Sequence, residues 1–172
     1  MMEALLHAYQ LKALTRAGWT RVGIEHPETV ASHSWGISLL ALALAPQDMN
    51  RERLLSYAAI HDLPECLAGD VTPHDGMSTD EKHRRERQAM ARLEQVGLPQ
   101  HLHALWLAYE SQRDPESQFV RQLDKLDMAI QALLYAPSAD VGEFLDSAKR
   151  GIHEPTLVAV MQEIRARWVR AV

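Results

Sequence analysis

The chain has 172 residues, of which 47% are hydrophobic and 24% charged, a composition that is ordinary for a soluble globular protein and allows one domain with a real core. Its formal net charge of −5 excludes a general attraction to nucleic acid or to an anionic membrane surface. The single cysteine, Cys66, excludes an intrachain disulfide, so a reducing cytosol is the expected compartment.

Apolar residues recur at helical spacing along nearly the whole chain, and no convincing alternation predicts a β-strand. The first helix is amphipathic and places Leu5, Leu6, Tyr9 and Ala13 on one face. This segment lacks the continuous apolar run of a signal peptide. The longest apolar run, Gly36–Pro46, is too short to span a bilayer and predicts a fully buried helix.

Prolines and glycines mark the next helix boundaries. Pro27 suits the first turn of a second helix, which continues to Leu44. A third helix begins at Arg51, and Pro64 must stop or kink it because proline clashes with the carbonyl four residues back. Gly69 then ends a short turn.

The second half of the chain opens with a capping box at Ser78–Glu81, which begins a charged helix that ends near Gly97. The remaining helices are expected at residues 100–111, 116–135, 141–149 and 155–172. The sequence therefore predicts a single all-α domain over residues 1–172, a helical bundle with seven to nine helices.

Two histidines occupy inward positions on neighbouring helices. His33 shares an apolar stripe with Ile37, and His61 shares one with Ala58. Asp62 follows on the last turn of the third helix. A lone inward histidine is more often a hydrogen-bonded core residue, and an aspartate can simply end a helix. Together, however, imidazole and carboxylate suit a divalent transition-metal ion such as Co, Mn, Fe, Ni or Zn, and burying them without a cation would be costly.

A further carboxylate ligand could come from the segment FVRQLDKLDMAIQALL, which carries Asp124 and Asp127 among apolar residues. At about 100° per residue, Asp127 lies nearer the apolar stripe, so periodicity alone favours Asp127. Both aspartates could also form a solvated edge.

Several segments resemble the HD-domain metal-dependent phosphohydrolases. The strings RAGW, PETVASHSW, HDLPECLAGD, EKHRRE and QLDKLDMA occur in the order expected for that family, from about Leu11 to Glu154. The chain is most similar to its branch of small 5′-deoxynucleotidases, which release phosphate from deoxynucleoside monophosphates. The resemblance implies an all-α fold, one catalytic divalent ion per chain and usually a homodimer.

The resemblance also implies a ligand set. The family pattern of His, His-Asp and Asp falls on His33, His61, Asp62 and Asp124, so it selects Asp124 over Asp127. One departure is Ser32, where many members carry an acidic residue directly before the first histidine.

Glu65 and Asp70 match two catalytic positions of the family. The glutamate that Glu65 matches orients or deprotonates the attacking water, which is a general-base role. Asp70 matches an aspartate beside the substrate that could transfer protons or hold the sugar. In isolation, Glu65 would read as a surface carboxylate and Asp70 as a loop cap.

Candidate substrate contacts follow from the same resemblance. Arg16 and Trp19 match an Arg/Trp element that contacts the nucleotide, and Arg21 is the alternative arginine because Gly18 stands directly before the tryptophan. Each arginine could instead be a surface residue. Trp19 could be plain core or could stack on a base or sugar.

Two lysines are further candidates for phosphate contact. Lys125 is adjacent to Asp124, a proposed ligand. Lys82 or Arg85 could meet additional phosphates if their helix borders the pocket. The charged cluster Lys82–Arg85 also fits a solvated helix face. His74 and His83 could support a second metal, but neither lies in a matching motif, so one ion is expected.

The expected function is hydrolysis of deoxynucleoside 5′-monophosphates by a cytoplasmic enzyme. The substrate is a free deoxynucleotide, because the chain carries no long basic stripe for a nucleic-acid backbone. One alternative keeps the same metal ligands but cleaves a deoxynucleoside triphosphate. Another is a catalytically silent metal-binding regulatory domain, which would have no need of Glu65.

Overall fold

The computed structural model describes residues 1–171, so Val172, the last residue expected in the C-terminal helix, lies outside the described residues. The described chain contains ten α-helices, of which eight have seven or more residues, and its only extended pairing is an isolated bridge between Thr15 and Thr29. This confirms the all-α class. The elements are α1 (Met2–Ala8), the 3-10 helix η1 (Tyr9–Lys12), α2 (Ala17–Arg21), α3 (Val30–Leu44), α4 (Arg51–Ile60), α5 (Glu65–Ala68), the 3-10 helix η2 (Pro73–Asp75), α6 (Thr79–Gln95), α7 (Gln100–Ser111), α8 (Pro115–Tyr135), α9 (Gly142–Gly151) and α10 (Pro155–Ala171).

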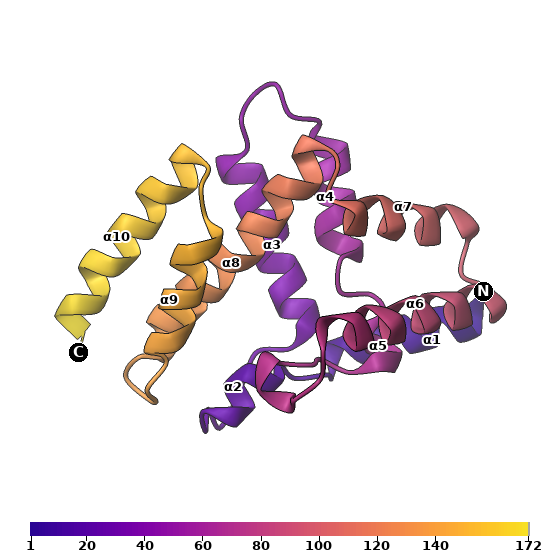
Figure 1. Cartoon of the computed structure of the whole chain (residues 1–172), viewed down its shortest axis with the longest axis horizontal. Coiled ribbons are helices and arrows are strands. Elements are labelled where there is room, and N and C mark those ends of the chain that lie inside the picture. Colours follow the sequence, from indigo (N-terminus) through magenta and orange to yellow (C-terminus); the bar gives the residue numbers. More distant parts are fainter. Residues whose placement is uncertain (172) are drawn as a thin grey trace.

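Helices α3, α4 and α8 form the centre of the molecule, with α9 and α10 on one side and α1, α6 and α7 on the other (Figure 1). The larger apolar core joins the central helices to α9 and α10 and includes Ile37, Leu54 and Leu123. A second core, around Met90 and Trp106, lies under α1, α6 and α7. Within the described range, no helix combines the length and apolarity needed to cross a bilayer.

Helix α3 begins at Val30, so the expectation that Pro27 lies in its first turn is wrong. The preceding residues are extended because Arg16 N donates to Glu28 O at 3.0 Å and Val30 N donates to Leu14 O at 2.9 Å. Thr29 caps the helix instead. This pairing ties the start of α3 to the segment that carries Arg16.

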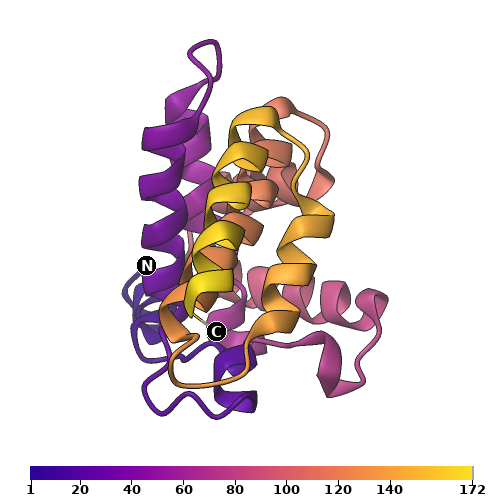
Figure 2. The ribbon, with the colours of Figure 1, turned by 90° about the vertical axis from the view of Figure 1, so that its left-hand side faces the viewer.

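The expectation that α3 is fully buried is also wrong. Its inner face is buried, with Ile37 wholly inaccessible, but Trp35, Leu39 and Leu42 on the outer face are 68%, 50% and 54% exposed. Figure 2 shows α3, in purple, along one edge of the molecule. Apolar side chains thus lie on both faces of the helix, and the rest of this chain covers those on the outer face only in part.

The N-terminal segment departs from the expected amphipathic helix. Helix α1 ends at Ala8 and continues as a 3-10 turn, which changes the side-chain period. The core residues are therefore Ala4 and Leu11, whereas the predicted stripe of Leu5, Leu6 and Tyr9 is exposed.

The segment that follows α4 folds as predicted. Helix α4 ends at Ile60, four residues before Pro64, and α5 is a single turn. It ends at Gly69, whose φ of 79° lies in the region that favours glycine.

Only half of the predicted capping box forms on α6. Ser78 accepts from the Glu81 amide, but the Glu81 carboxylate pairs with Arg84 and Arg85.

Candidate active site

Four predicted metal ligands come together where α3, α4 and α8 meet. His33 lies on the inner face of α3, His61 and Asp62 directly follow α4, and Asp124 lies on α8. Both histidines are buried, at 0% and 5% exposure. The rings are 5.4 Å apart between centroids. The inward positions predicted from helical spacing are confirmed.

Hydrogen bonds fix the orientation of both imidazoles. His33 Nδ1 lies 2.7 Å from Asp127 Oδ2, and His61 Nδ1 lies 2.9 Å from the Ala58 carbonyl oxygen, to which it can donate. In each case the other ring nitrogen, Nε2, is buried and has no hydrogen-bond partner. Buried polar atoms rarely remain unpaired, so the two Nε2 atoms are available to a ligand.

Carboxylate oxygens lie next to these free nitrogens. Asp62 Oδ2 is 3.0 Å from His61 Nε2 and 3.8 Å from His33 Nε2, and Asp124 Oδ1 is 3.1 Å from His33 Nε2. Potential ligand atoms of His33, His61 and Asp62 all lie within 4.8 Å of one another. This donor set fits a divalent transition-metal ion.

The two aspartates of α8 contact opposite nitrogens of one imidazole. Asp124 lies at Nε2 of His33, on the side of the free nitrogens, whereas Asp127 lies at Nδ1. Asp124 is therefore the α8 carboxylate that could join His61 and Asp62 around an ion. Ser32, in contrast, is exposed, and its hydroxyl pairs with that of Thr29.

Charge neighbours keep the carboxylates of this cluster ionised. Burial raises the pKa of Asp62, but His61, Arg16 and His33 outweigh it and hold that pKa below its usual value. Burial likewise opposes ionisation of Asp124, yet Lys125 and His33 hold the pKa of that carboxyl well below its usual value. Burial and Arg16 lower the pKa of His33, but Asp124 and Asp127 raise it to about 9. Asp62 and Asp124 are thus ionised, the form in which a carboxylate can bind a metal ion.

Glu65 lies beside the cluster, on the one-turn helix α5. Its side chain is 2% exposed, its Oε2 is buried without a hydrogen-bond partner, and Lys82 Nζ lies 3.9 Å from its Oε1. Burial, followed by repulsion from Asp62 and Asp70, raises the pKa of Glu65 well above its ordinary value. A carboxyl group in this position can take up a proton readily.

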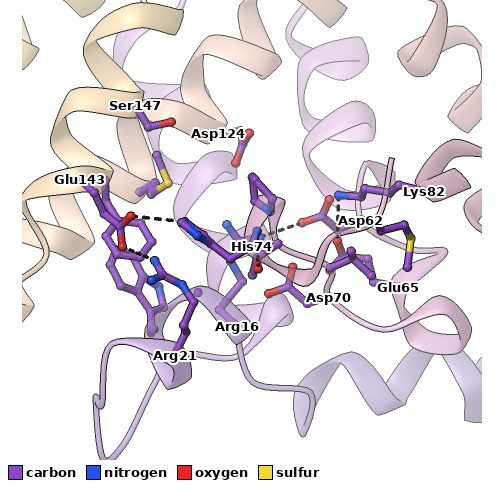
Figure 3. A pocket seen from close by; sticks show the side chains of 18 of the residues that line it. Arg16, Arg21, Asp62, Glu65, Asp70, His74, Lys82, Asp124, Glu143 and Ser147 are labelled. Carbon is purple, nitrogen blue, oxygen red and sulfur yellow. Dashed lines mark hydrogen bonds and ion pairs between the residues drawn. The ribbon is translucent and has the colours of Figure 1, made fainter. Parts of the chain in front are cut away.

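Asp62, Asp124 and Glu65 line the inner end of a cavity of about 760 Å³, and the two buried histidines lie behind them (Figure 3). Three cations belong to the same wall: Arg16 Nη1 lies 3.4 Å from Asp62 Oδ2, Lys125 Nζ lies 3.3 Å from Asp124 Oδ2, and Lys82 contacts Glu65 as described above. Figure 3 shows Arg16 and Lys82 directed toward Asp62 and Glu65. The inner end thus combines candidate metal ligands with cations that can meet a phosphate.

Asp70 connects this wall to α2. Its Oδ2 accepts a hydrogen bond of 2.7 Å from the Ala17 amide, directly after Arg16. The carboxylate therefore fixes the segment that presents Arg16 to the cavity, and Asp70 itself lines the cavity.

The outer end of the cavity contains a group that sequence reasoning missed. Glu143, on α9, pairs with Arg21 through one oxygen and lies 3.4 Å from His74 Nε2 through the other. This network joins α2, η2 and α9 across the cavity mouth (Figure 3). Arg21 is therefore paired at the mouth, while Arg16 is the arginine beside the candidate ligands.

Trp19 fits its interpretation as a core residue. It is 1% exposed, its Nε1 donates to Glu28 Oε1 at 2.8 Å, and its ring packs against Tyr135 and Phe144 at centroid distances of 5.2 and 4.1 Å. The residue is nevertheless one of those that line the cavity. These contacts leave little surface for stacking on a substrate.

The two basic residues of α6 that were candidate phosphate contacts lie in different places. Lys82 lines the cavity, whereas Arg85 pairs with Glu81 on the helix surface and is not part of the lining. His83 lies near Glu86 and Glu110, in a group of possible ligands that includes neither His33 nor His61.

The helical fold and the central cluster of His33, His61, Asp62 and Asp124 are those expected of an HD-domain protein. A model of the HD domain family matches residues 8–164, and the chain belongs to this family. It is 35% identical over 181 residues to "5′-deoxynucleotidase HDDC2" of Danio rerio, with 99% of this chain and 90% of that protein covered. It is 34% identical over 173 residues to the human protein of that name, with 96% and 85% covered.

A solved structure shares the fold of this chain. The PH0347 protein from Pyrococcus horikoshii OT3 superposes with a TM-score of 0.82 at 29% sequence identity, covering 97% of this chain and 99% of that one. The family resemblance inferred from the sequence motifs is confirmed.

Proposed function

We propose that this protein is a metal-dependent 5′-deoxynucleotidase that hydrolyses deoxynucleoside 5′-monophosphates to deoxynucleoside and phosphate. One observation carries the proposal: two buried imidazole Nε2 atoms without partners meet Asp62 and Asp124 at the inner end of a cavity that cations also line. The names of the curated relatives support the same activity.

In this proposal, His33, His61, Asp62 and Asp124 hold one divalent ion, with Co, Mn, Fe, Ni and Zn all compatible with the donor set. A bound ion of this kind polarises a phosphoryl oxygen and lowers the pKa of water. The protein supplies buried ligands whose orientation is fixed before binding, because His33 and His61 each use Nδ1 in a hydrogen bond.

Glu65 is the proposed general base. Its carboxyl is buried next to the cluster and its pKa is raised, so it can accept a proton from the attacking water and return it to the leaving oxygen. Lys82, 3.9 Å away, balances the negative charge on Glu65 before the proton moves.

Arg16, Lys125 and Lys82 are the proposed phosphate contacts, because they project into the inner end of the cavity. Asp70 holds the backbone beside Arg16 and lines the cavity, where we propose that it contacts the sugar. A wall closed around deoxyribose leaves neither room nor a partner for a 2′-hydroxyl.

Phosphate release from matched 2′-deoxy and 2′-hydroxy nucleoside monophosphates tests this proposal. We expect deoxynucleotides to be hydrolysed faster in the presence of a divalent transition-metal ion. Release of triphosphate from deoxynucleoside triphosphates would instead support the alternative activity, and equal rates on both sugars would remove the selectivity. Metal binding without hydrolysis of any nucleotide would favour a silent regulatory domain.

The proposal includes a homodimer that covers the outer face of α3. Large apolar side chains gathered on one face of a helix are normally covered, but Trp35, Leu39 and Leu42 of α3 are 68%, 50% and 54% exposed on one edge of the molecule. Leu39→Lys should therefore produce monomers in analytical ultracentrifugation, whereas Leu134→Lys, at an exposed leucine of α8, should leave the assembly unchanged. A wild-type chain that sediments as a monomer would contradict this part of the proposal.

A further inference from the structure

We propose that Asp127 is a positioning residue for the metal centre, and that Gly36 is glycine in order to accommodate it. Asp127 lies behind His33, on the side opposite the candidate metal ligands. This inference rests on the proposed metal site and concerns residues outside the ligand set.

The first argument is the geometry around His33. The ring is completely buried, and Asp127 Oδ2 lies 2.7 Å from Nδ1. A carboxylate at Nδ1 requires a proton on that nitrogen, which leaves Nε2 as the free lone pair of the neutral ring. Asp127 thereby selects both the ring rotation and the tautomer that a metal ion needs.

The second argument is the position of Gly36, one turn after His33 on the same face of α3. Glycine in the middle of a helix is unfavourable relative to alanine because of its backbone entropy. Here a Cβ would overlap Asp127 Oδ1 and come within 3.1 Å of Asp127 Cγ. The missing side chain therefore provides the space in which the Asp127 carboxylate lies against the helix.

The two observations concern the two oxygens of one carboxylate. Oδ2 contacts His33, and Oδ1 occupies the space above Gly36. Asp127 is also largely buried, with 13% of its side chain exposed. Its position is thus restricted from both sides, as expected for a group whose task is to hold a ligand in one orientation.

Binding of Mn²⁺ alone, measured by calorimetry on the full chain, tests the inference. Asp127→Ala should weaken Mn²⁺ binding by about 10- to 100-fold, the usual effect of losing an outer partner of a metal-binding histidine. Asp127→Asn, whose amide oxygen can still accept from Nδ1, should lose less. A low-field imidazole N–H resonance in the proton NMR spectrum should disappear in Asp127→Ala.

A double-mutant cycle separates positioning from general stability. Gly36→Ala should weaken Mn²⁺ binding in the wild-type background, because the new methyl group displaces the carboxylate. In the Asp127→Ala background it should have no further effect, because nothing remains to be displaced. Matched controls are Gly142→Ala, where a Cβ would meet its nearest neighbour at an ordinary 3.5 Å, and Asp146→Ala on the exposed face of α9.

The outcomes distinguish this inference from the proposed function. If the wild-type chain binds no divalent ion, the metal site itself is wrong. If the wild-type chain binds Mn²⁺ and folded Asp127→Ala binds it equally well, only the positioning role is overturned. Additive losses in the double variant would likewise overturn the link between Gly36 and Asp127.

Discussion

The two ends of the cavity are built differently. At the inner end, the candidate ligands are held by α3, α4 and α8, and both histidines are buried. At the outer end, the Arg21, His74 and Glu143 side chains are 34%, 53% and 44% exposed and come from a short helix, a 3-10 turn and the first turn of α9. The inner groups lie among central helices, and the outer groups meet only through side chains in contact with solvent.

This difference predicts where substitutions will matter. Interactions between buried charges are weakly screened, and removing one partner leaves the other uncompensated. Exposed ion pairs typically contribute less than about 1 kcal/mol. We therefore expect large effects on metal binding and turnover at the inner end and small effects on substrate binding at the mouth.

The largest expected effect is loss of the ion. His61→Ala or Asp62→Ala should abolish binding of the divalent ion and with it phosphate release, because each removes a ligand atom from the cluster. Wild-type protein should gain about 2.7 kcal/mol of unfolding free energy at a metal concentration of 100 Kd, and neither variant should. Elemental analysis and thermal unfolding measure this, with exposed His101→Ala as the control. Full metal occupancy in His61→Ala would contradict the ligand assignment.

The next largest effect should be on turnover alone. Glu65→Gln should keep the ion but lower kcat by about 10²- to 10⁴-fold, the range for a general base. Burial raises the pKa of Glu65, so its ionisation costs the folded state stability as the pH rises above the ordinary value of 4.5. The variant should therefore be at least as stable as the wild type at neutral pH. Near-normal turnover would remove Glu65 from the mechanism.

Arg16 should give an intermediate effect. It contacts Asp62 at 3.4 Å and lines the inner end of the cavity, where charge-assisted hydrogen bonds contribute about 1.5–3 kcal/mol. Arg16→Lys should thus lower kcat/KM for a deoxynucleoside monophosphate by about 10- to 100-fold while the ion stays bound. The same substitution at Arg113, outside the cavity lining, is the control. An unchanged kcat/KM would argue against a phosphate contact.

The inner end was largely predictable because helical spacing carries the information. The stripes through His33 and His61 showed which way these side chains point, and both are buried. Spacing alone favoured Asp127 over Asp124, but both aspartates reach the same imidazole, and spacing does not show which of its nitrogens each one meets. The preference for Asp124 as the metal ligand came from the family motif and not from the helical angle.

The outer end and the outer face of α3 were not predictable in this way. Glu143 and Arg21 are separated by 122 positions in sequence, and nothing in the local pattern around either residue indicates their contact. The apolar run of α3 predicted burial correctly for Ile37 but not for Leu39 or Leu42. A run of apolar residues indicates that a face avoids water, and it does not say whether the same chain covers that face.

The smallest expected effect is at the mouth of the cavity, and it tests directly whether the exposed outer end contributes less than the buried inner end. Glu143→Gln removes the charge that Arg21 and His74 share, but all three side chains are substantially exposed. Because an exposed ion pair contributes less than about 1 kcal/mol, the substitution should lower kcat/KM by less than about fivefold and leave metal binding unchanged. Because salt screens exposed charges, the difference between variant and wild type should shrink as ionic strength increases. Glu163→Gln, at an exposed ion pair on α10, is the matched control. A loss above about 100-fold, insensitive to salt, would be too large for an exposed ion pair and would place Glu143 within the substrate-binding machinery.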